Sequence, residues 1–357
     1  MNITLFIGSI SVGGAERVLC NLANYLKQKG HTVEILVMSE TVRNYYVRPD
    51  VKVVPLIKNE ERKSRLYNAV VRYLRLAMYM RSRNDVDRYV VMLPGTIVMM
   101  LSLAKKTKAK IIASERSDPA SYPAFTQFLL KHYFKRADGL VFQTDDALKW
   151  CSLAVRDARS VVIPNAINPE FVREPYTGDK VKRVVAAGRM IALKNYAMLI
   201  DAFSKIADDV PECNLTIFGK GPERKNLEEQ AEKLGIADRV SFPGYVDNMP
   251  EELEKSTLFV MPSDFEGMPN ALMEAMSVGL PCISTDCPCG GPRFLIQNGI
   301  NGFLVPVGDK DSMAETMMYL LTHDEERSKI GNKAMEIREQ LSPEKIYQTW
   351  EDFIVNV

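Results

Sequence analysis

Short apolar runs that alternate with longer stretches of helical periodicity are the feature that most constrains how this chain can fold. Each run has the length of a buried strand, and strands separated by helices pair in parallel sheets through crossover connections. The runs in the first half lie at residues 3–7, 32–38, 51–57, 89–93, 111–114, 140–143 and 161–164. Those in the second half lie at residues 184–188, 215–219, 240–243, 258–261, 282–285 and 303–306. The sequence therefore predicts an α/β protein.

The length of the chain predicts more than one domain. A chain of 357 residues exceeds the size at which a single hydrophobic core normally keeps growing. A polar stretch with Pro and Gly, ending near residue 181, has the composition of a linker. No apolar run is long enough to span a bilayer, and the start lacks the pattern of a signal peptide. We expect a cytoplasmic protein with domains over 1–165 and 166–340, followed by a terminal helix over 341–357.

Two glutamates stand eight residues apart where the apolar run 258–261 gives way to a helix that begins near Asn270. These are Glu266 and Glu274. Open parallel sheets bind ligands at the carboxyl ends of their strands, and a helix N-terminus there offers N–H groups and a positive dipole to an anion. The two acids could instead only cap the helix or favour its dipole.

Further motifs occur in a fixed order along nearly the full chain. They are Gly13-Gly14 after the first apolar run, Gly188-Arg189 with Lys194-Asn195, Gly219-Lys-Gly221-Pro, Gly244-Tyr-Val246 and Asn298-Gly-Ile-Asn301-Gly302. Together with the glutamate pair, this series resembles glycosyltransferase family 4, whose members are retaining, nucleotide-sugar-dependent enzymes of the GT-B fold. The resemblance implies two Rossmann-like domains with parallel sheets facing across a cleft. It assigns acceptor binding to the N-terminal domain and donor binding to the C-terminal domain, and it implies that the last helix returns to the first domain.

The resemblance also assigns roles to single residues. Arg189 and Lys194 match residues that bind the diphosphate, Glu266 matches one that contacts the donor sugar near the reacting centre, and Glu274 matches one that accepts hydrogen bonds from the ribose. The expected catalytic residues are Glu266, Arg189 and Lys194. The expected donor-binding residues are Gly13, Gly14, Arg189, Lys194, Gly219, Val246, Glu266, Gly267, Met268, Pro269, Asn270 and Glu274.

Neither a metal nor another cofactor is expected. In the family the leaving diphosphate itself helps to deprotonate the acceptor, and cationic side chains balance its charge. Asp85-Val-Asp87 has the spelling of a metal-binding Asp-x-Asp, but it precedes a strand and follows a basic helix, so we interpret it as a chance match. The six cysteines are expected to be reduced thiols, because no second pair accompanies Cys287 and Cys289 at zinc-ligand spacing.

The acceptor site is less clearly marked. Glu115 and Arg116 follow the apolar run 111–114, where many family members carry a histidine that this chain lacks. We expect these two residues to contact the acceptor, with Arg116 placed to bind a phosphate. The surrounding sequence looks like relatives that build capsule, exopolysaccharide or O-antigen on a polyprenyl diphosphate carrier. A second departure is Phe294, where the family commonly has glutamate.

Charge is unevenly distributed along the chain. Residues 1–165 have an excess of Lys and Arg, and the remaining residues have an excess of Asp and Glu. Basic and apolar residues alternate in segments 58–83 and 125–136. Helices of this kind bind anionic membrane surfaces, although their apolar residues could equally pack on the domain's own sheet. Nucleic acid is not an expected partner, because no recognised nucleic-acid module is visible.

Together with the basic segments, the resemblance implies a retaining hexosyltransferase on the inner face of the plasma membrane. Its donor would be a nucleoside-diphosphate sugar, most often UDP-linked in the family, carrying a hexose or an N-acetylhexosamine. Its acceptor would be a hydroxyl of a polyprenyl-diphosphate-linked or other saccharide. Two alternatives stay open, namely a sugar-nucleotide epimerase of related fold and a non-catalytic nucleotide-sugar-binding partner of a transferase.

Overall fold

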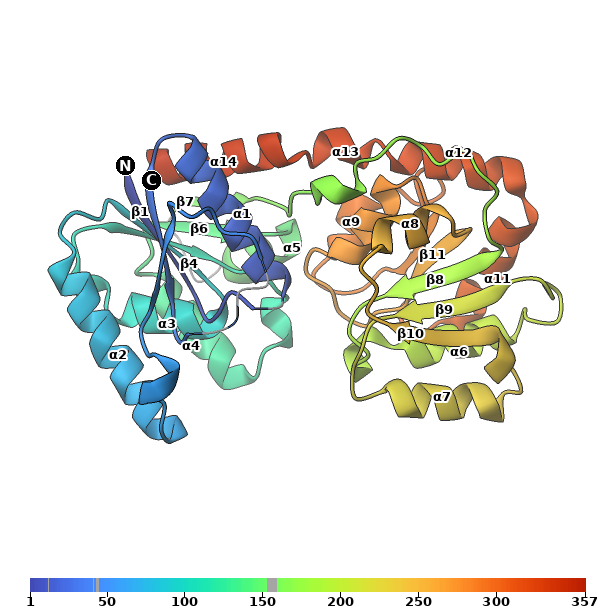
Figure 1. Ribbon diagram of the computed structural model, residues 1–357, viewed down its shortest axis with the longest axis horizontal. Coiled ribbons are helices and arrows are strands. Elements are labelled where there is room, and N and C mark those ends of the chain that lie inside the picture. Colours follow the sequence, from blue (N-terminus) through green and yellow to red (C-terminus); the bar gives the residue numbers. More distant parts are fainter. Residues whose placement is uncertain (12, 41, 43–44, 153–158) are drawn as a thin grey trace. The chain divides into compact units, whose positions relative to one another are not determined.

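The computed structural model describes residues 1–357 except 12, 41, 43–44 and 153–158. The chain divides into two compact units, one formed by Met1–Ala166 with Glu344–Val357 and the other by Ile167–Pro343. The expected boundaries at 165/166 and 340/341 lie close to these divisions. In each unit, helices cover both faces of a parallel sheet (Figure 1).

The first unit contains a sheet of seven strands in the order β3-β2-β1-β4-β5-β6-β7. The strands are β1 (Asn2–Ile7), β2 (Thr32–Val37), β3 (Lys52–Pro55), β4 (Arg88–Met92), β5 (Lys110–Ser114), β6 (Gly139–Phe142) and β7 (Arg159–Val162). The helices are α1 (Gly14–Gln28), α2 (Arg65–Ser82), α3 (Pro94–Ser102), α4 (Ala124–Phe134), α5 (Asp145–Ser152) and, from the end of the chain, α14 (Pro343–Asn356). All pairings between these strands are parallel.

The second unit contains a sheet of six parallel strands in the order β10-β9-β8-β11-β12-β13. The strands are β8 (Arg183–Ala187), β9 (Asn214–Phe218), β10 (Val240–Gly244), β11 (Leu258–Met261), β12 (Cys282–Thr285) and β13 (Phe303–Val305). The helices are α6 (Tyr196–Ser204), α7 (Arg224–Lys233), α8 (Met249–Glu254), α9 (Asn270–Ser277), α10 (Gly291–Leu295), α11 (Lys310–Thr322), α12 (Asp324–Ala334) and α13 (Ile337–Gln340).

The prediction of an α/β fold with two Rossmann-like units is confirmed, and every predicted apolar run overlaps one of these strands. The poorest agreement is at β7, which begins at Arg159 rather than 161. This strand lies at the edge of the sheet, and its first two residues are exposed and polar, so they lack the apolar signal on which the prediction depended.

The C-terminal helix α14 is anchored in the first unit. Trp350 is fully buried there, the Tyr25 hydroxyl donates to the Gln348 side chain over 2.9 Å, and the Arg88 Nε donates to the carbonyl of Ile354 over 3.0 Å. Burial of one large aromatic side chain contributes on the order of 2–3 kcal/mol. Within the described residues, no helix has the length and apolar composition needed to cross a membrane.

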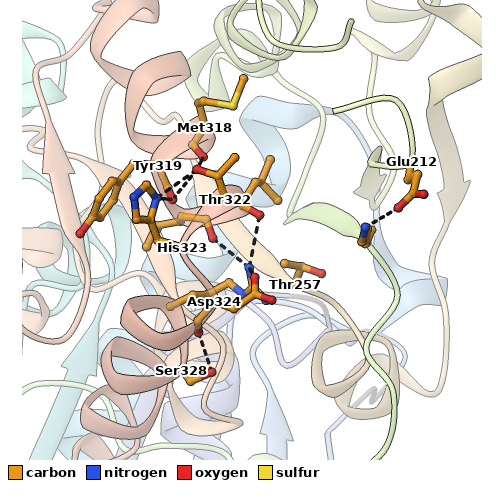
Figure 2. A network of polar contacts seen from close by, with 12 residues as sticks. Glu212, Thr257, Met318, Tyr319, Thr322, His323, Asp324 and Ser328 are labelled. Atoms are coloured by element: carbon orange, nitrogen blue, oxygen red, sulfur yellow. Dashed lines mark hydrogen bonds and ion pairs between the residues drawn. The ribbon is translucent and has the colours of Figure 1, made fainter. Parts of the chain in front are cut away.

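Polar contacts define the junction of α11 and α12 in the second unit (Figure 2). The Thr322 hydroxyl donates to the carbonyl of Met318 over 2.8 Å, and the Ser328 hydroxyl donates to the carbonyl of Asp324 over 2.8 Å. Both hydroxyls donate to the carbonyl four positions earlier in their own helix. The Arg327 guanidinium of α12 donates to the carbonyl of Leu320 in the last turn of α11 over 3.0 Å and so joins the two helices. The network therefore stabilises a helix junction.

Candidate active site

The strand order of the second unit places two loops side by side. Strands β8 and β11 are neighbours, and from this pair the chain proceeds toward opposite edges of the sheet. Such a reversal leaves a crevice at the carboxyl ends of the two strands, where ligands of doubly wound sheets bind. The loop after β8 carries Arg189 and Lys194, and the loop after β11 carries Glu266. Topology therefore brings the three predicted catalytic residues to one edge.

Lys194 and Glu266 form an ion pair across these loops, although they are 72 positions apart in sequence. The Lys194 ammonium group donates to Oε1 of Glu266, and the Ser263 hydroxyl donates to the same oxygen over 2.7 Å. Only 22% of the Lys194 side chain and 11% of the Glu266 side chain are exposed. Charge-assisted hydrogen bonds in such a shielded place are strong and keep both side chains oriented.

Arg189 is placed differently. Its side chain is exposed, two residues after β8 ends at Ala187, and no hydrogen bond or ion pair of its guanidinium is found within the described ranges. A guanidinium without an internal partner, close to a lysine that already has one, is available to an external anion. The structure thus offers one cation paired with a carboxylate and a second cation open to solvent.

The loop that carries Glu266 packs against the segment before α10 and the first residue of that helix. The backbone N–H of Glu266 donates to the carbonyl of Pro288 over 3.3 Å. Gly291 packs so closely that a Cβ at this position would collide with the carbonyl oxygen of Gly267. The loop that carries Glu266 and Gly267 is therefore fixed by backbone packing. Phe294, the departure from the family pattern, lies on α10 with 46% of its surface exposed.

Helix α9 begins directly after this loop and has no side-chain cap at Pro269. The N–H groups in the first turn of α9 could therefore donate hydrogen bonds to a ligand oxygen. Met268 and Pro269 are buried, while Gly267 and Asn270 are partly exposed. Pro269 has no N–H, so its backbone cannot donate a hydrogen bond to a ligand. Glu274 lies in the second turn of α9, partly exposed among buried neighbours.

The ends of β8, β9 and β10 are joined by backbone contacts. The N–H of Gly219 donates to the carbonyl of Gly244 over 2.8 Å, and a Cβ on Gly219 would collide with the carbonyl oxygen of Gly188. Gly219 has a φ of +125°, which side-chain-bearing residues rarely adopt. Val246 follows two residues after β10, at the same sheet edge.

In the first unit, the glycine motif precedes α1 as expected, but its donor already has a partner. The N–H of Gly13 donates to the Tyr45 hydroxyl over 3.1 Å, and that hydroxyl donates to the carbonyl of Gly13 over 3.0 Å. Gly14 is the first residue of α1. A phosphate oxygen could reach the Gly13 amide only by displacing Tyr45. The sequence carried no signal for this contact, since 32 residues separate the pair.

Glu115 and Arg116 are buried at the carboxyl end of β5, with 1% and 8% of their surfaces exposed. The Glu115 Oε1 accepts from the N–H groups of Arg116 and Ser117 and from the Tyr122 hydroxyl over 2.8 Å. The Arg116 guanidinium donates to the carbonyl of Ile163 and to the Asn165 side chain. Two of its nitrogens therefore already have partners inside the fold, while its Nε is buried without one, an arrangement that the sequence alone did not reveal.

Burial raises the pKa of the Glu115 carboxyl from 4.5 to about 7, despite the opposing hydrogen bonds. A raised folded-state pKa stabilises the protein below pH 4.5, and this stabilisation is lost as pH rises through 7. Glu115→Gln cannot ionise. Its free energy of unfolding minus that of wild type should therefore rise by about 3 kcal/mol between pH 4.5 and pH 8. Urea unfolding at both pH values measures this change, with Glu228→Gln on the exposed surface as the control. Parallel pH profiles for Glu115→Gln and wild type would contradict it.

Asp85 and Asp87 lie near the amino end of β4, away from the carboxyl ends of the strands. Asp85 pairs with Arg83 over 2.8 Å, and Asp87 accepts the N–H of Asn2 over 2.8 Å. Their observed role is to fix the start of the first sheet. In the described part of the chain, no group of three or more His, Cys, Asp or Glu side chains could hold a metal ion. The six cysteines are buried thiols rather than members of disulfides, and burial raises the pKa of Cys287 to about 12.

Comparison with known proteins places the chain among sugar transferases. The family model Glycosyltransferase Family 4 matches residues 12–171, and the model Glycosyl transferases group 1 matches residues 169–337. The chain is 26% identical over 364 residues to an alpha-1,4-N-acetyl-D-galactosaminyltransferase of Campylobacter jejuni, covering 100% of this chain and 99% of that protein. The name of that relative specifies a saccharide on diphospho-undecaprenol.

Another relative shares only part of its length with this chain. An exopolysaccharide phosphotransferase of Streptomyces coelicolor is 33% identical over 224 residues, which cover 62% of this chain but 23% of that protein. Among solved structures, Anabaena HepE in complex with UDP has a TM-score of 0.84 and 16% identity, with 100% of both chains covered. The likeness to HepE shows the fold. Because the two family models together match residues 12–337 and the fold is GT-B, the chain belongs to the glycosyltransferases of family 4.

Proposed function

We propose that this chain is a retaining glycosyltransferase that moves a hexose or an N-acetylhexosamine from a nucleoside-diphosphate sugar, UDP-linked as the first candidate. The acceptor is a hydroxyl of a lipid-linked saccharide in capsule, exopolysaccharide or O-antigen synthesis. The observation that carries the proposal is the Lys194–Glu266 pair at the switch point of the second sheet, next to the uncapped N-terminus of α9.

The charges at this edge suit the departure of a diphosphate. As the sugar–phosphate bond breaks, negative charge grows on the leaving oxygen while the sugar becomes oxocarbenium-like. Arg189 and Lys194 bind the phosphates, and the N–H groups at the start of α9 add a positive dipole. The Glu266 carboxylate orients the sugar and stabilises its developing positive charge without forming a covalent adduct. The leaving oxygen takes the proton of the attacking hydroxyl on the same face, which gives retention.

The relatives support the choice of substrates. HepE binds UDP in its solved complex, and the Campylobacter relative bears the name of a transferase acting on a diphospho-undecaprenol-linked saccharide. In the proposed complex, Glu274 accepts hydrogen bonds from the ribose, Val246 meets the base, and Gly219 lies beside the phosphates. In the first unit, the proposed role of Gly13 and Gly14 is to bind a phosphate oxygen, which requires displacement of Tyr45.

A donor-turnover assay with and without a polyprenyl-diphosphate-linked saccharide separates this proposal from its alternatives. A transferase releases the nucleoside diphosphate much faster when the acceptor is present, and the product keeps the anomeric configuration of the donor. An epimerase would convert the sugar nucleotide without an acceptor. A non-catalytic partner would bind the nucleotide sugar and release nothing. Inversion at the anomeric carbon would overturn the retaining assignment alone.

Transfer should not depend on a divalent cation, and no cofactor is proposed, because Arg189, Lys194 and the α9 N-terminus supply positive charge to the diphosphate. We expect a saturating concentration of EDTA to change the initial rate by less than about twofold. The measurement is acceptor-dependent release of nucleoside diphosphate, with calcium-saturated EDTA as the control. Loss of activity that magnesium or manganese restores would contradict this prediction.

We also propose that the enzyme acts at the inner face of the plasma membrane, through exposed apolar side chains on α2 and α4. One face of α2 is covered, with Leu76 and Met80 buried. Its outer face exposes Leu66, Val70, Leu74 and Met78, and α4 exposes Phe125 and Phe128. Such apolar surface beside basic residues suits the boundary between lipid headgroups and acyl chains.

Not every basic residue of this segment is free to meet lipid. Arg75 pairs with Glu61 over 2.7 Å, Arg83 pairs with Glu34 over 3.0 Å, and Arg72 donates to Ser39 over 2.6 Å. These arginines join α2 to β2 and to the segments after β2 and β3. Arg65 and Arg81 are exposed on α2, and no ion pair of theirs occurs within the described ranges. A test of membrane binding should therefore change Arg65 and Arg81 and spare the paired arginines.

Replacing Leu66, Leu74 and Met78 by Gln should weaken binding to anionic vesicles at least tenfold, because three exposed apolar side chains no longer enter the lipid boundary. Arg65→Gln with Arg81→Gln should weaken it several-fold at low salt and less at high salt. Vesicle sedimentation measures both effects, with Ile300→Gln in the second unit as the exposed apolar control. Unchanged sedimentation of the triple variant would show that this face is only solvated.

A further inference from the structure

Asn195, which directly follows Lys194, has an unusual backbone conformation. Its φ of 46° and ψ of 40° lie in the left-handed region. For a residue other than glycine this conformation costs roughly 1 kcal/mol, and asparagine is among the few residues that adopt it. Such a conformation persists where surrounding contacts fix it. The contacts of Asn195 therefore indicate which groups this conformation keeps in place.

The Asn195 side chain uses both ends of its amide. Its Oδ1 accepts the N–H of Met198 over 3.3 Å and caps α6, while its Nδ2 donates to Oδ1 of Asp264 over 2.8 Å. Asp264 also contacts the same loop through its backbone, because its N–H donates to the carbonyl of Leu193 over 3.0 Å. The two loops at the ends of β8 and β11 are thus joined twice, directly beside Lys194 and two residues before Glu266.

We propose that Asn195 and Asp264 are positioning residues that hold Lys194 and Glu266 at the distance and orientation needed for sugar transfer. A lysine on an untethered loop would spread over many rotamers, and a displacement of about 1 Å in a reacting constellation can cost on the order of a hundredfold in rate. The amide–carboxylate bond fixes the backbone on both sides of the ion pair. This inference rests on the proposed function of the Lys194–Glu266 pair, and it adds the two residues that set the geometry of that pair.

Exchange of the two side chains gives a direct test. Asn195→Asp places two carboxylates against each other and should lower kcat at least thirtyfold, since like charges in contact repel. Asp264→Asn keeps an oxygen that can accept from Asn195 and should cost less than fivefold. In the double variant, the carboxylate introduced at position 195 would cap α6 and accept from the new amide at position 264. Its kcat should therefore recover to within about fivefold of wild type.

Two controls separate positioning from stability. Asp309→Ala removes a comparable cap, that of α11 with its 3.0 Å bond from the Ser312 N–H, and should lower Tm while leaving kcat unchanged. In a Lys194→Ala background, Asn195→Asp should reduce the residual kcat by less than threefold, because the ion pair whose geometry it sets is absent. The measurements are kcat and KM for the donor at a temperature at which every variant is folded, with Tm determined in parallel.

The outcomes are distinct. Wild-type kcat in Asn195→Asp, no recovery in the double variant, or an equal loss of kcat in the Lys194→Ala background would each overturn the positioning role. Failure of the proposed function looks different, since wild type itself would then neither release nucleoside diphosphate nor transfer sugar. If wild type is active and the Asn195 variants change only Tm, the transferase assignment stands and the pair is merely structural.

Discussion

Lys194→Ala is expected to lower the rate of sugar transfer by two or more orders of magnitude while the enzyme stays folded. The ammonium group lies at the carboxyl end of β8 and pairs with Glu266, so it faces the place where the leaving diphosphate gains charge. A preorganised charge that meets developing opposite charge in a shielded site is worth about 3–4 kcal/mol. Arg189→Ala should have a similar effect, because the Arg189 guanidinium has no hydrogen-bond or ion-pair partner in the described part of the chain and is available to the diphosphate.

The measurement is kcat and kcat/KM for acceptor-dependent release of nucleoside diphosphate, with Tm as a check of folding. Lys205→Ala is the matched control, because Lys205 lies in the same unit and pairs with the exposed Asp311. An exposed pair contributes little, so this control should keep wild-type kinetics. Wild-type rates in both Lys194→Ala and Arg189→Ala, at unchanged Tm, would remove these residues from the leaving-group site.

Glu266→Gln should lower kcat about a hundredfold and change donor affinity much less. The amide keeps the size of the side chain and an oxygen for the Ser263 hydroxyl, but it removes the negative charge that stabilises the oxocarbenium-like sugar. The ground-state sugar is neutral, so the loss falls mainly on the transition state. A separate titration of the donor by calorimetry distinguishes the effect on binding from the effect on kcat.

Glu228→Gln is the control for Glu266→Gln, since Glu228 forms an exposed pair with Arg224 on α7 over 2.8 Å. Ser263→Ala gives a graded comparison, because it removes one of the two donors to Glu266 Oε1 and leaves the carboxylate charged. We expect its loss of kcat to lie between those of wild type and Glu266→Gln. An equal loss of donor affinity and kcat in Glu266→Gln would assign the glutamate to binding alone.

Motif and spacing identified the main parts of the candidate site from sequence. Lys194 and Glu266 were both expected beside strand ends, and the structure joins them in one ion pair. The supporting groups escaped the sequence analysis. Ser263 lies three residues before Glu266, a spacing that could have suggested a local hydrogen bond, whereas no local pattern connects Asn195 with Asp264. Tyr45 and Gly13 were equally unconnected in sequence.

The sequence by itself determined where strands and helices form, because apolar periodicity and glycine positions act over a few neighbouring residues. It also determined which motifs follow which strands. Only the tertiary structure decided what those motifs contact. The pairing of β8 with β11 brings Lys194 and Glu266 together although they are 72 positions apart, and the buried Arg116 guanidinium donates a hydrogen bond to the carbonyl of Ile163. The packing of α2 leaves Leu76 buried and Leu74 exposed. These outcomes depend on strand order and on packing between distant segments, which local periodicity does not specify.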